Sequence, residues 1–266
     1  MTDAVIKEFK DGIEIWRMNH VETRNAITNR QMIDTLVLYA EQAQQNTQVR
    51  VIILTGNGSA FSSGGNIKEI RAQMTESDKT PHELATWYRE GIQRIPLAFE
   101  KLDVPIIAAV NGPAIGAGCD LTCMCDMRIA AQSARFAESF VKLGIIPGDG
   151  GAWLLPRAVG LAKAAEMAFT GDPISAQEAL ACGLVSKVVA DDQLMDEARA
   201  LAKRVAVNPP ISVRMAKQLM REGQKTGLDT HLQMAAVMQA VSHRTKDHKE
   251  AMDAIFEKRD ADFKGC

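Results

Sequence analysis

The sequence predicts an α/β protein that ends in a helical region. Two apolar runs of strand length, 49–55 (VRVIILT) and 104–110 (VPIIAAV), each lead into a glycine-containing turn. Stretches with apolar residues at helical spacing separate them, and beyond Asp192 every stretch is of the helical kind, with a break at 208–210 (NPP). Strands alternating with helices are typical of the α/β class. We therefore expect two regions, an α/β core over 1–205 and a helical region over 206–266.

The remaining elements follow from local patterns. Apolar and polar residues alternate around Asp11-Gly12, a pair that favours a hairpin turn, and a helix is expected from about Thr28. Ser175 lies three residues before Glu178, the capping-box spacing that begins a helix. Further elements are expected as one long helix over 81–101, helices over 152–159 and 162–169, and strands over 128–131 and 185–189.

Composition and charge exclude several classes of function. The chain has 266 residues and a net charge of −2, so no general surface for nucleic acid is expected. No stretch approaches the roughly 20 apolar residues that span a bilayer, and residues 1–10 do not resemble a signal peptide. Five cysteines, an odd number, favour a reduced compartment over a disulfide framework. These features predict a cytoplasmic protein that binds neither membrane nor nucleic acid.

Two segments, 51–70 and 105–126, share one design: a buried strand, a glycine-rich turn and the start of a helix. Glycine lets the backbone approach a ligand closely. A helix start offers unpaired N–H groups and a partial positive charge. Two such turns facing each other would form an oxyanion hole for acyl-group chemistry, although each turn taken alone could be purely structural.

These segments resemble the two signature segments of the crotonase (enoyl-CoA hydratase/isomerase) family. Three further segments are similar to that family in the same order: 140–160 (FVKLGIIPGDGGAWLLPRAVG), 170–189 and the tail 256–265 (FEKRDADFKG). The resemblance implies a crotonase-type spiral of ββα units with a helical carboxyl-terminal region used for trimer assembly, in a homotrimer or hexamer. It also implies an acyl-CoA substrate and no separate cofactor, because coenzyme A is part of the substrate.

The resemblance assigns roles to individual positions. The backbone N–H groups of Gly65 and Ala117 would hold the thioester oxygen. The family's first catalytic glutamate position is occupied by Asp120, and its second falls on Phe140, which cannot transfer a proton. Asp149, in the PGDGG loop, is a candidate replacement. For Asp149 the alternative is a residue that caps the next helix, and for Asp120 it is a charge stabilised by the helix dipole.

The missing glutamate bears on the reaction. Hydration of a 2-enoyl thioester is easiest with two carboxylates, whereas moving a double bond between the 3- and 2-positions needs only one base. The loss at Phe140 therefore favours isomerase chemistry, or a hydratase that uses Asp120 and Asp149. A non-catalytic acyl-CoA-binding member and a related crotonase-type hydrolase remain as alternatives. Glu138 is expected at the surface.

Coenzyme A recognition rests on shorter resemblances. The turn at 24–26 resembles the family's adenine-contact turn, Lys68 resembles a residue near the phosphates, and the tail resembles one that reaches the coenzyme A of a neighbouring subunit. The expected substrate or coenzyme A contacts are Arg24, Ala26, Ser63, Lys68, Phe140, Phe263 and Lys264. Cys119, Cys123 and Cys125 have no histidine near them in sequence, so no metal site is expected. The glycines at 112, 116 and 118 lack the spacing of a dinucleotide fingerprint.

Overall fold

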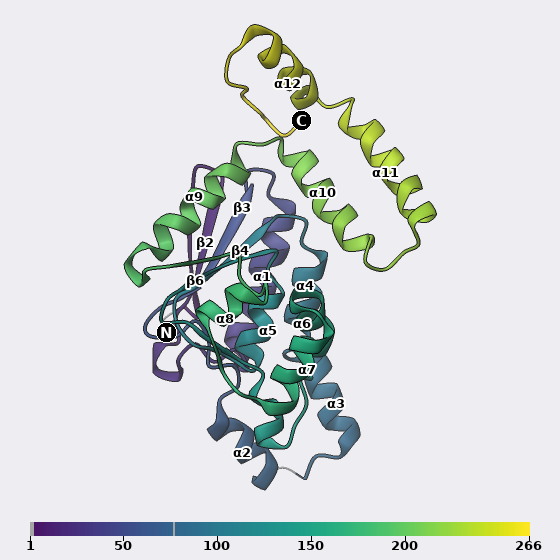
Figure 1. The fold of residues 1–266 in the computed structure, drawn as a ribbon. Coiled ribbons are helices and arrows are strands. Elements are labelled where there is room, and N and C mark those ends of the chain that lie inside the picture. The colour runs from purple at the N-terminus through teal and green to yellow at the C-terminus, as the bar shows by residue number, and fades with distance from the viewer. Residues whose placement is uncertain (1–2, 77) are drawn as a thin grey trace.

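The computed structural model describes residues 3–76 and 78–266, and its centre is a six-stranded sheet (Figure 1). The strand order is β1-β2-β3-β4-β6-β9, in which β1 and β2 are antiparallel and all other neighbours are parallel. The bounds are β1 (Val5–Lys10), β2 (Ile13–Met18), β3 (Val51–Gly56), β4 (Ile106–Val110), β6 (Met127–Ala131) and β9 (Lys187–Val189). Asp11 and Gly12 have φ angles of 52° and 78°, which confirms the expected hairpin turn.

Apolar side chains cover both faces of this sheet. In β3, Ile52 and Leu54 belong to the large core beneath α1 (Arg30–Gln45) and α5 (Ala117–Cys123), while Val51 and Ile53 belong to a second core beneath α9 (Leu194–Ala206). A strand buried on both faces has no polar alternation. This explains the uninterrupted apolar runs in the sequence.

A smaller sheet positions the segments between β4 and β9. It consists of β5 (Ala114–Ile115), β7 (Arg135–Ala137) and β8 (Ile174–Ser175), and it is surrounded by short helices. These are the 3₁₀ helix η2 (Ser139–Leu143), α6 (Gly151–Val159), α7 (Leu161–Thr170) and α8 (Ala176–Ala181). The capping box at the start of α8 is confirmed: Ser175 and Glu178 each bind the other's backbone N–H. Two more 3₁₀ helices are η1 (Val21–Thr23) and η3 (Asp191–Gln193).

The single helix expected over 81–101 is wrong. The chain forms α3 (Pro81–Glu90) and α4 (Arg94–Lys101), which follow α2 (Ile67–Glu76), and it turns at Gly91. Pro96 is the physical reason, because proline lacks an N–H and clashes with the carbonyl four residues earlier. A new helix that begins at Arg94 places Pro96 in the first turn, where no such hydrogen bond is needed.

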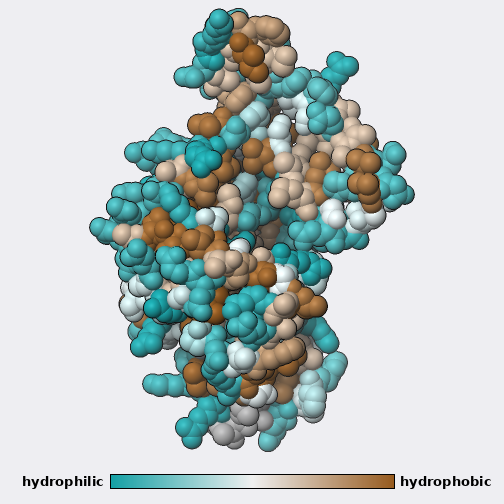
Figure 2. Space-filling model, viewed as in Figure 1, coloured by the Kyte–Doolittle hydropathy of each residue, from teal (hydrophilic) through white to brown (hydrophobic). Residues whose placement is uncertain are grey.

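The carboxyl-terminal region is helical as expected, but it has more breaks than the one at 208–210. It comprises α10 (Pro210–Glu222), α11 (Leu228–Ser242) and α12 (Lys246–Glu257), followed by a non-helical tail. Figure 1 shows α11 and α12 projecting away from the sheet. Apolar side chains lie at the surface there (Figure 2), and none of the residues of α11 is buried.

Polar contacts hold α10 against the core. The guanidinium of Arg214 donates hydrogen bonds to the carbonyls of Gln44 (3.0 Å), Asn46 (2.9 Å) and Val49 (3.1 Å), at the end of α1. The carbonyl of Gln44 lies in the last turn of α1, where helix carbonyls have no N–H donor within the helix, and those of Asn46 and Val49 lie just beyond the helix. A cation at this negative end of the helix dipole is therefore doubly favourable.

Candidate active site

The turn after β3 is fixed against the segment that leads into α5. The N–H groups of Phe61 and Ser62 both donate to the carbonyl of Pro113 at 3.1 Å. The N–H of Ile115 donates in return to the carbonyl of Ser62 at 3.0 Å. Ser62 and Ala114 also form a parallel bridge. The two glycine-rich turns predicted from the sequence therefore lie side by side.

Close backbone contact explains the glycines in both turns. Gly64 has a φ of +76°, and a Cβ there would overlap the carbonyl oxygen of Ile115 and lie 3.0 Å from the nitrogen of Ala117. A Cβ on Gly118 would overlap the carbonyl oxygen of Ser62 in the same way. Only residues without a side chain allow this approach.

Each turn presents one backbone N–H without a protein acceptor. Gly65 lies just before α2, and Ala117 is the first residue of α5. In the described part of the chain, neither N–H donates a hydrogen bond to backbone or side chain. Because Ala117 begins a helix, its N–H also lies at the positive end of the helix dipole. Two neighbouring free amides are the donors that an oxyanion hole requires.

Three carboxyl groups from different elements are buried together near these turns. Asp120 comes from the first turn of α5, Glu138 follows β7, and Asp149 lies in the loop before α6. Their exposed fractions are 0%, 1% and 2%. No N–H or hydroxyl of the described chain donates to either oxygen of Asp120, to either oxygen of Asp149 or to Oε1 of Glu138, so only the carboxyl groups themselves can serve one another as partners.

The burial of Glu138 contradicts the expected surface position. Its side chain continues the inward face of β7, on which Phe136 is also buried, two residues earlier. This period of two is the signal in the sequence that could have located it. Asp149 does not cap α6 either, because the capping residue is Gly150 and both oxygens of Asp149 are unpartnered.

Burial and mutual repulsion change how the three acids ionise. Burial, followed by the charges of Asp149 and Glu138, raises the pKa of Asp120 well above its usual range. Burial also raises the pKa of Glu138 and that of Asp149, while hydrogen bonding from Asp120 opposes both increases. Of the three acids, Asp120 is the one whose neutral form is favoured most.

Tight packing fixes the Asp120 carboxyl. A Cβ on Gly151 would overlap Oδ1 of Asp120, so the start of α6 lies directly against this group. The ring of Phe140 lies at the Gly116 turn, where a Cβ on Gly116 would be 3.6 Å from Cζ of Phe140. Phe140 thus forms an apolar wall beside the Ala117 amide instead of supplying a second acid.

Two hollows flank the loop at 144–150. One, of about 540 Å³, is lined by Asp149 together with Leu97 and Trp153, and the other, of about 510 Å³, by Tyr88 and Ile146. Burial, and then the charge of Asp149, raises the pKa of Tyr88. An apolar acyl chain would find space on either side of the loop that carries Asp149.

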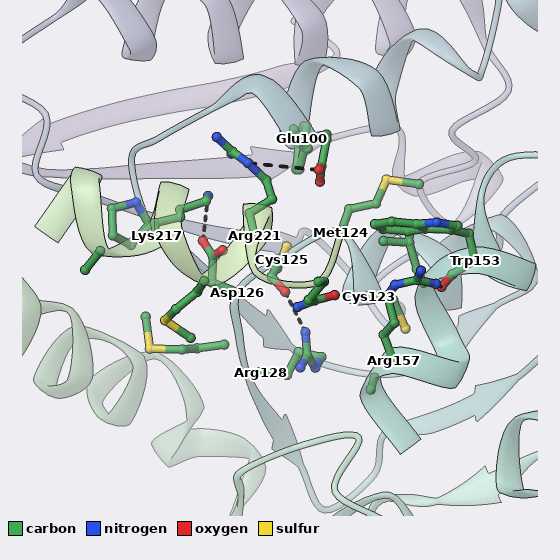
Figure 3. Close-up of a pocket in the computed structure, with 18 of the residues that line it drawn as sticks. Glu100, Cys123, Met124, Cys125, Asp126, Arg128, Trp153, Arg157, Lys217 and Arg221 are labelled. Carbon is green, nitrogen blue, oxygen red and sulfur yellow. Dashed lines mark hydrogen bonds and ion pairs between the residues drawn. The ribbon is translucent and has the colours of Figure 1, made fainter. Parts of the chain in front are cut away.

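A third hollow lies apart from the three acids, between α10 and the segment that joins α5 to β6 (Figure 3). It has a volume of about 480 Å³, and its charged side chains are already engaged. Lys217 contacts Asp126 at 2.7 Å, and the guanidinium of Arg157 stacks on Trp153 at 3.7 Å from the ring centre. None of the three buried acids lines this hollow.

Sequence comparison identifies the chain. The sequence model of the enoyl-CoA hydratase/isomerase family matches residues 8–266. The chain belongs to this family. It is 35% identical to the 2,3-dehydroadipyl-CoA hydratase of Escherichia coli K12 over 265 residues and 32% identical to the 1,2-epoxyphenylacetyl-CoA isomerase of that strain over 266 residues, with 100% of each chain covered. The solved enoyl-CoA hydratase of Bacillus anthracis superposes with a TM-score of 0.91 and 34% identity, covering 99% of this chain and 100% of that one. The family and fold expected from the sequence are thereby confirmed.

Four of the expected coenzyme A contacts belong to neighbouring segments in this enoyl-CoA hydratase/isomerase family member. The N–H of Ser63 donates to the carbonyl of Arg24 at 2.8 Å, so the turn at 24–26 lies against the Gly64 turn. Arg24 is exposed and Ala26 is buried, while Lys68 is exposed in the first turn of α2.

Phe263 and Lys264 lie elsewhere in the chain. The carbonyl of Phe263 accepts a hydrogen bond from Arg50 at 2.5 Å, and the N–H of Lys264 donates to Asp247 on α12. The carboxyl terminus is far from α2 (Figure 1). Within one chain, the fold does not bring the tail to the other expected coenzyme A contacts.

Two further features concern metals and membranes. In residues 3–76 and 78–266, no three His, Cys, Asp or Glu side chains are arranged to hold a metal ion. No helix in this part of the chain has the length and apolar content needed to cross a bilayer. Cys119, Cys123 and Cys125 are free buried thiols.

Proposed function

We propose that this protein transfers protons beside the thioester of an enoyl-CoA, with hydration of a 2-enoyl-CoA as its main reaction. The observation that carries this proposal is that Asp120 and Asp149 interact in one buried cluster beside the two free amides. Hydration needs a base for water and an acid for the neighbouring carbon. The pair supplies both, which compensates for the missing glutamate at Phe140.

The geometry suggests how each group contributes. The N–H groups of Gly65 and Ala117 would bind the thioester oxygen and stabilise the negative charge of the enolate, a contribution of roughly 3–4 kcal/mol per donor in comparable sites. Ionised Asp149 would take a proton from water as its oxygen bonds to carbon 3. Neutral Asp120 would then give its proton to carbon 2, so that the enolate collapses to the 3-hydroxyacyl thioester.

A second reaction, isomerisation of a 3-enoyl-CoA to the 2-enoyl form, is favoured by Phe140. Its apolar ring at the Gly116 turn leaves that side of the cleft without an acid. One base then suffices: Asp149 would remove a proton from carbon 2 and return it to carbon 4. The relative named 1,2-epoxyphenylacetyl-CoA isomerase supports isomerase chemistry in proteins of this kind.

Ultraviolet absorbance of the conjugated enoyl thioester separates these reactions. Absorbance lost from a 2-enoyl-CoA indicates hydration, and absorbance gained from a 3-enoyl-CoA indicates isomerisation. Asp149→Asn should lower turnover by roughly 100-fold or more, and Asp120→Asn should do so for hydration. As a control, Asp172→Asn, an exposed carboxylate paired with Lys142, should leave turnover unchanged. If the protein binds coenzyme A but turns over neither substrate, it is a non-catalytic acyl-CoA-binding protein and the proposal is wrong.

We place the adenine end of coenzyme A at Arg24 and Ala26 and its phosphates near Ser63 and Lys68. The hydrogen bond between the N–H of Ser63 and the carbonyl of Arg24 supports this proposal, because it holds the two turns next to each other. Lys68→Ala should raise KM for an acyl-CoA and leave kcat unchanged, because the phosphates are remote from the reacting carbons. An unchanged KM would remove Lys68 from this surface.

We also propose a homotrimer or a hexamer in the cytoplasm, in which Phe263 and Lys264 reach the coenzyme A of a neighbouring subunit. The exposed apolar side chains of α11 support assembly, because a helix of this composition is normally buried. Five free cysteines are consistent with a reducing compartment. Light scattering that gives the mass of a monomer would contradict the assembly.

A further inference from the structure

Glu138 has no part in the reaction as proposed above, yet it is buried against the reacting acids. It is 1% exposed, and no N–H or hydroxyl of the described chain donates to its Oε1. No lysine or arginine of the described chain forms an ion pair with Glu138, Asp120 or Asp149. Three uncompensated negative charges in an apolar environment are highly unfavourable. The three acids must therefore retain protons between them.

Asp120 is the centre of this cluster. Its carboxyl lies within hydrogen-bonding reach of those of Asp149 and Glu138, and these are also the groups whose negative charges it faces. A neutral carboxyl has only one O–H to donate. If Asp120 donates to Asp149, the proposed base is occupied and cannot accept a proton from water. If it donates to Glu138, Asp149 stays free.

We propose that Glu138 is a positioning residue: it accepts the hydrogen bond of the Asp120 carboxyl and so keeps the Asp120 proton away from Asp149. This inference rests on the proposed function, since it assigns Asp149 as base and Asp120 as acid. Glu138 is 1% exposed and follows the inner face of β7, so it acts through Asp120 and not on the substrate. Its negative charge also keeps Asp120 protonated at neutral pH, ready to deliver its proton.

Few other titratable groups face the cluster. Cys119 and Cys123 on α5 are buried thiols beside Glu138, and Arg128 acts on Cys123 from β6. Tyr88 on α3 faces Asp149. The pKa of Cys119 is raised, first by hydrogen bonding with Cys123 and then by burial, so this thiol stays neutral. The negative charge of Glu138 is therefore the main one that substitution can remove without touching the proposed acid or base.

The decisive variant is Glu138→Gln, which keeps the shape and removes the charge. In a bell-shaped profile of kcat against pH, the acidic limb reports Asp149 and the basic limb reports Asp120. Loss of the neighbouring charge should move the basic limb to lower pH by about one unit or more. The plateau of kcat should fall, because the Asp120 proton can then occupy Asp149, while KM should change little. Glu138→Asp, which restores a carboxylate, should return the basic limb part of the way. Thr122→Val, an uncharged change in the same buried region, should leave both limbs in place. An unmoved basic limb in Glu138→Gln would overturn the proposal.

Infrared spectroscopy of the resting protein tests the proton's position without any turnover. A protonated carboxyl band should be present in the wild type at neutral pH, be lost in Asp120→Asn and shift in frequency in Glu138→Gln. A band lost in Glu138→Gln and retained in Asp120→Asn would place the proton on Glu138 and overturn the inference. Because this readout needs no substrate, it distinguishes a wrong proton assignment from a wrong reaction.

Discussion

Gly64→Ala tests whether the contact between the two turns controls activity. At this residue φ is +76°, and a new Cβ would overlap the carbonyl oxygen of Ile115. The left-handed conformation alone costs an L-residue about 1–2 kcal/mol. The overlap with backbone adds about 1–3 kcal/mol, since neither turn can yield by rotating a side chain. The total loss of stability should be roughly 2–5 kcal/mol.

The loss of activity should be larger than the loss of stability suggests. Relief of the overlap requires the Gly64 turn to move away from the Ala117 amide, which separates the two proposed donors. Loss of one such donor lowers kcat by roughly 100- to 1000-fold. The measurement is kcat with an enoyl-CoA substrate at a temperature where urea titration shows the variant to be folded.

Gly183→Ala is the matched control. Gly183 has a similar φ of +80°, but a Cβ there would meet only the carbonyl oxygen of Ala158, at 3.8 Å. It should lose the conformational 1–2 kcal/mol and keep its kcat. If Gly64→Ala retains the wild-type kcat, or if Gly183→Ala lowers kcat by the same factor, the contact between the turns does not set the position of the amides.

Three further substitutions test how the fold is held together. Arg214→Ala should lower the free energy of unfolding by about 1–3 kcal/mol, because three carbonyls, two of them in part-buried hydrogen bonds, lose a charged donor. A urea titration that shows less than about 0.5 kcal/mol would refute this. Burial alone would raise the pKa of Asp103, but hydrogen bonds led by that from Arg221 lower it. The ionised carboxylate therefore adds to the free energy of unfolding above the unfolded pKa of about 3.9, and this contribution is lost as the pH falls through the lower pKa of the folded state. Asp103→Asn should therefore destabilise the protein at neutral pH and much less at about pH 3, whereas an equal effect at both would exclude an ionic role. Asp247 accepts the N–H of Gly265 at 2.8 Å, so Asp247→Ala should speed tryptic cleavage of the tail, measured by mass spectrometry, and unchanged cleavage would show that other contacts hold it.

The fold was largely predictable because its strands and helix starts have local signals. The Asp11-Gly12 hairpin and the Ser175 capping box need only a few adjacent residues, and both are confirmed. The break between α3 and α4 has a local signal too, in Pro96, which the apolar periodicity of 81–101 outweighed. The extra breaks in the carboxyl-terminal region were missed because helical spacing continues on both sides of each loop.

The site was predictable only in part. Gly65 and Ala117, the proposed backbone donors, lie in glycine-rich motifs that can be read from the sequence, and the structure places their turns side by side. Glu138 was missed because a charged side chain is rarely buried, and this expectation outweighed the period of two that it shares with the buried Phe136. The buried cluster around Asp120 could not be predicted, because its three acids come from segments that are distant in the sequence.

The composition of α11 has a consequence for how this protein must be handled. None of its residues is buried, and Leu228, Leu232 and Val237 are more than half exposed. If neighbouring subunits cover these side chains, unfolding is coupled to dissociation and the melting temperature rises with protein concentration. The stabilities of variants should then be compared only at equal protein concentrations. In a dilute enzyme assay the protein would be less stable than in a thermal melt at high protein concentration.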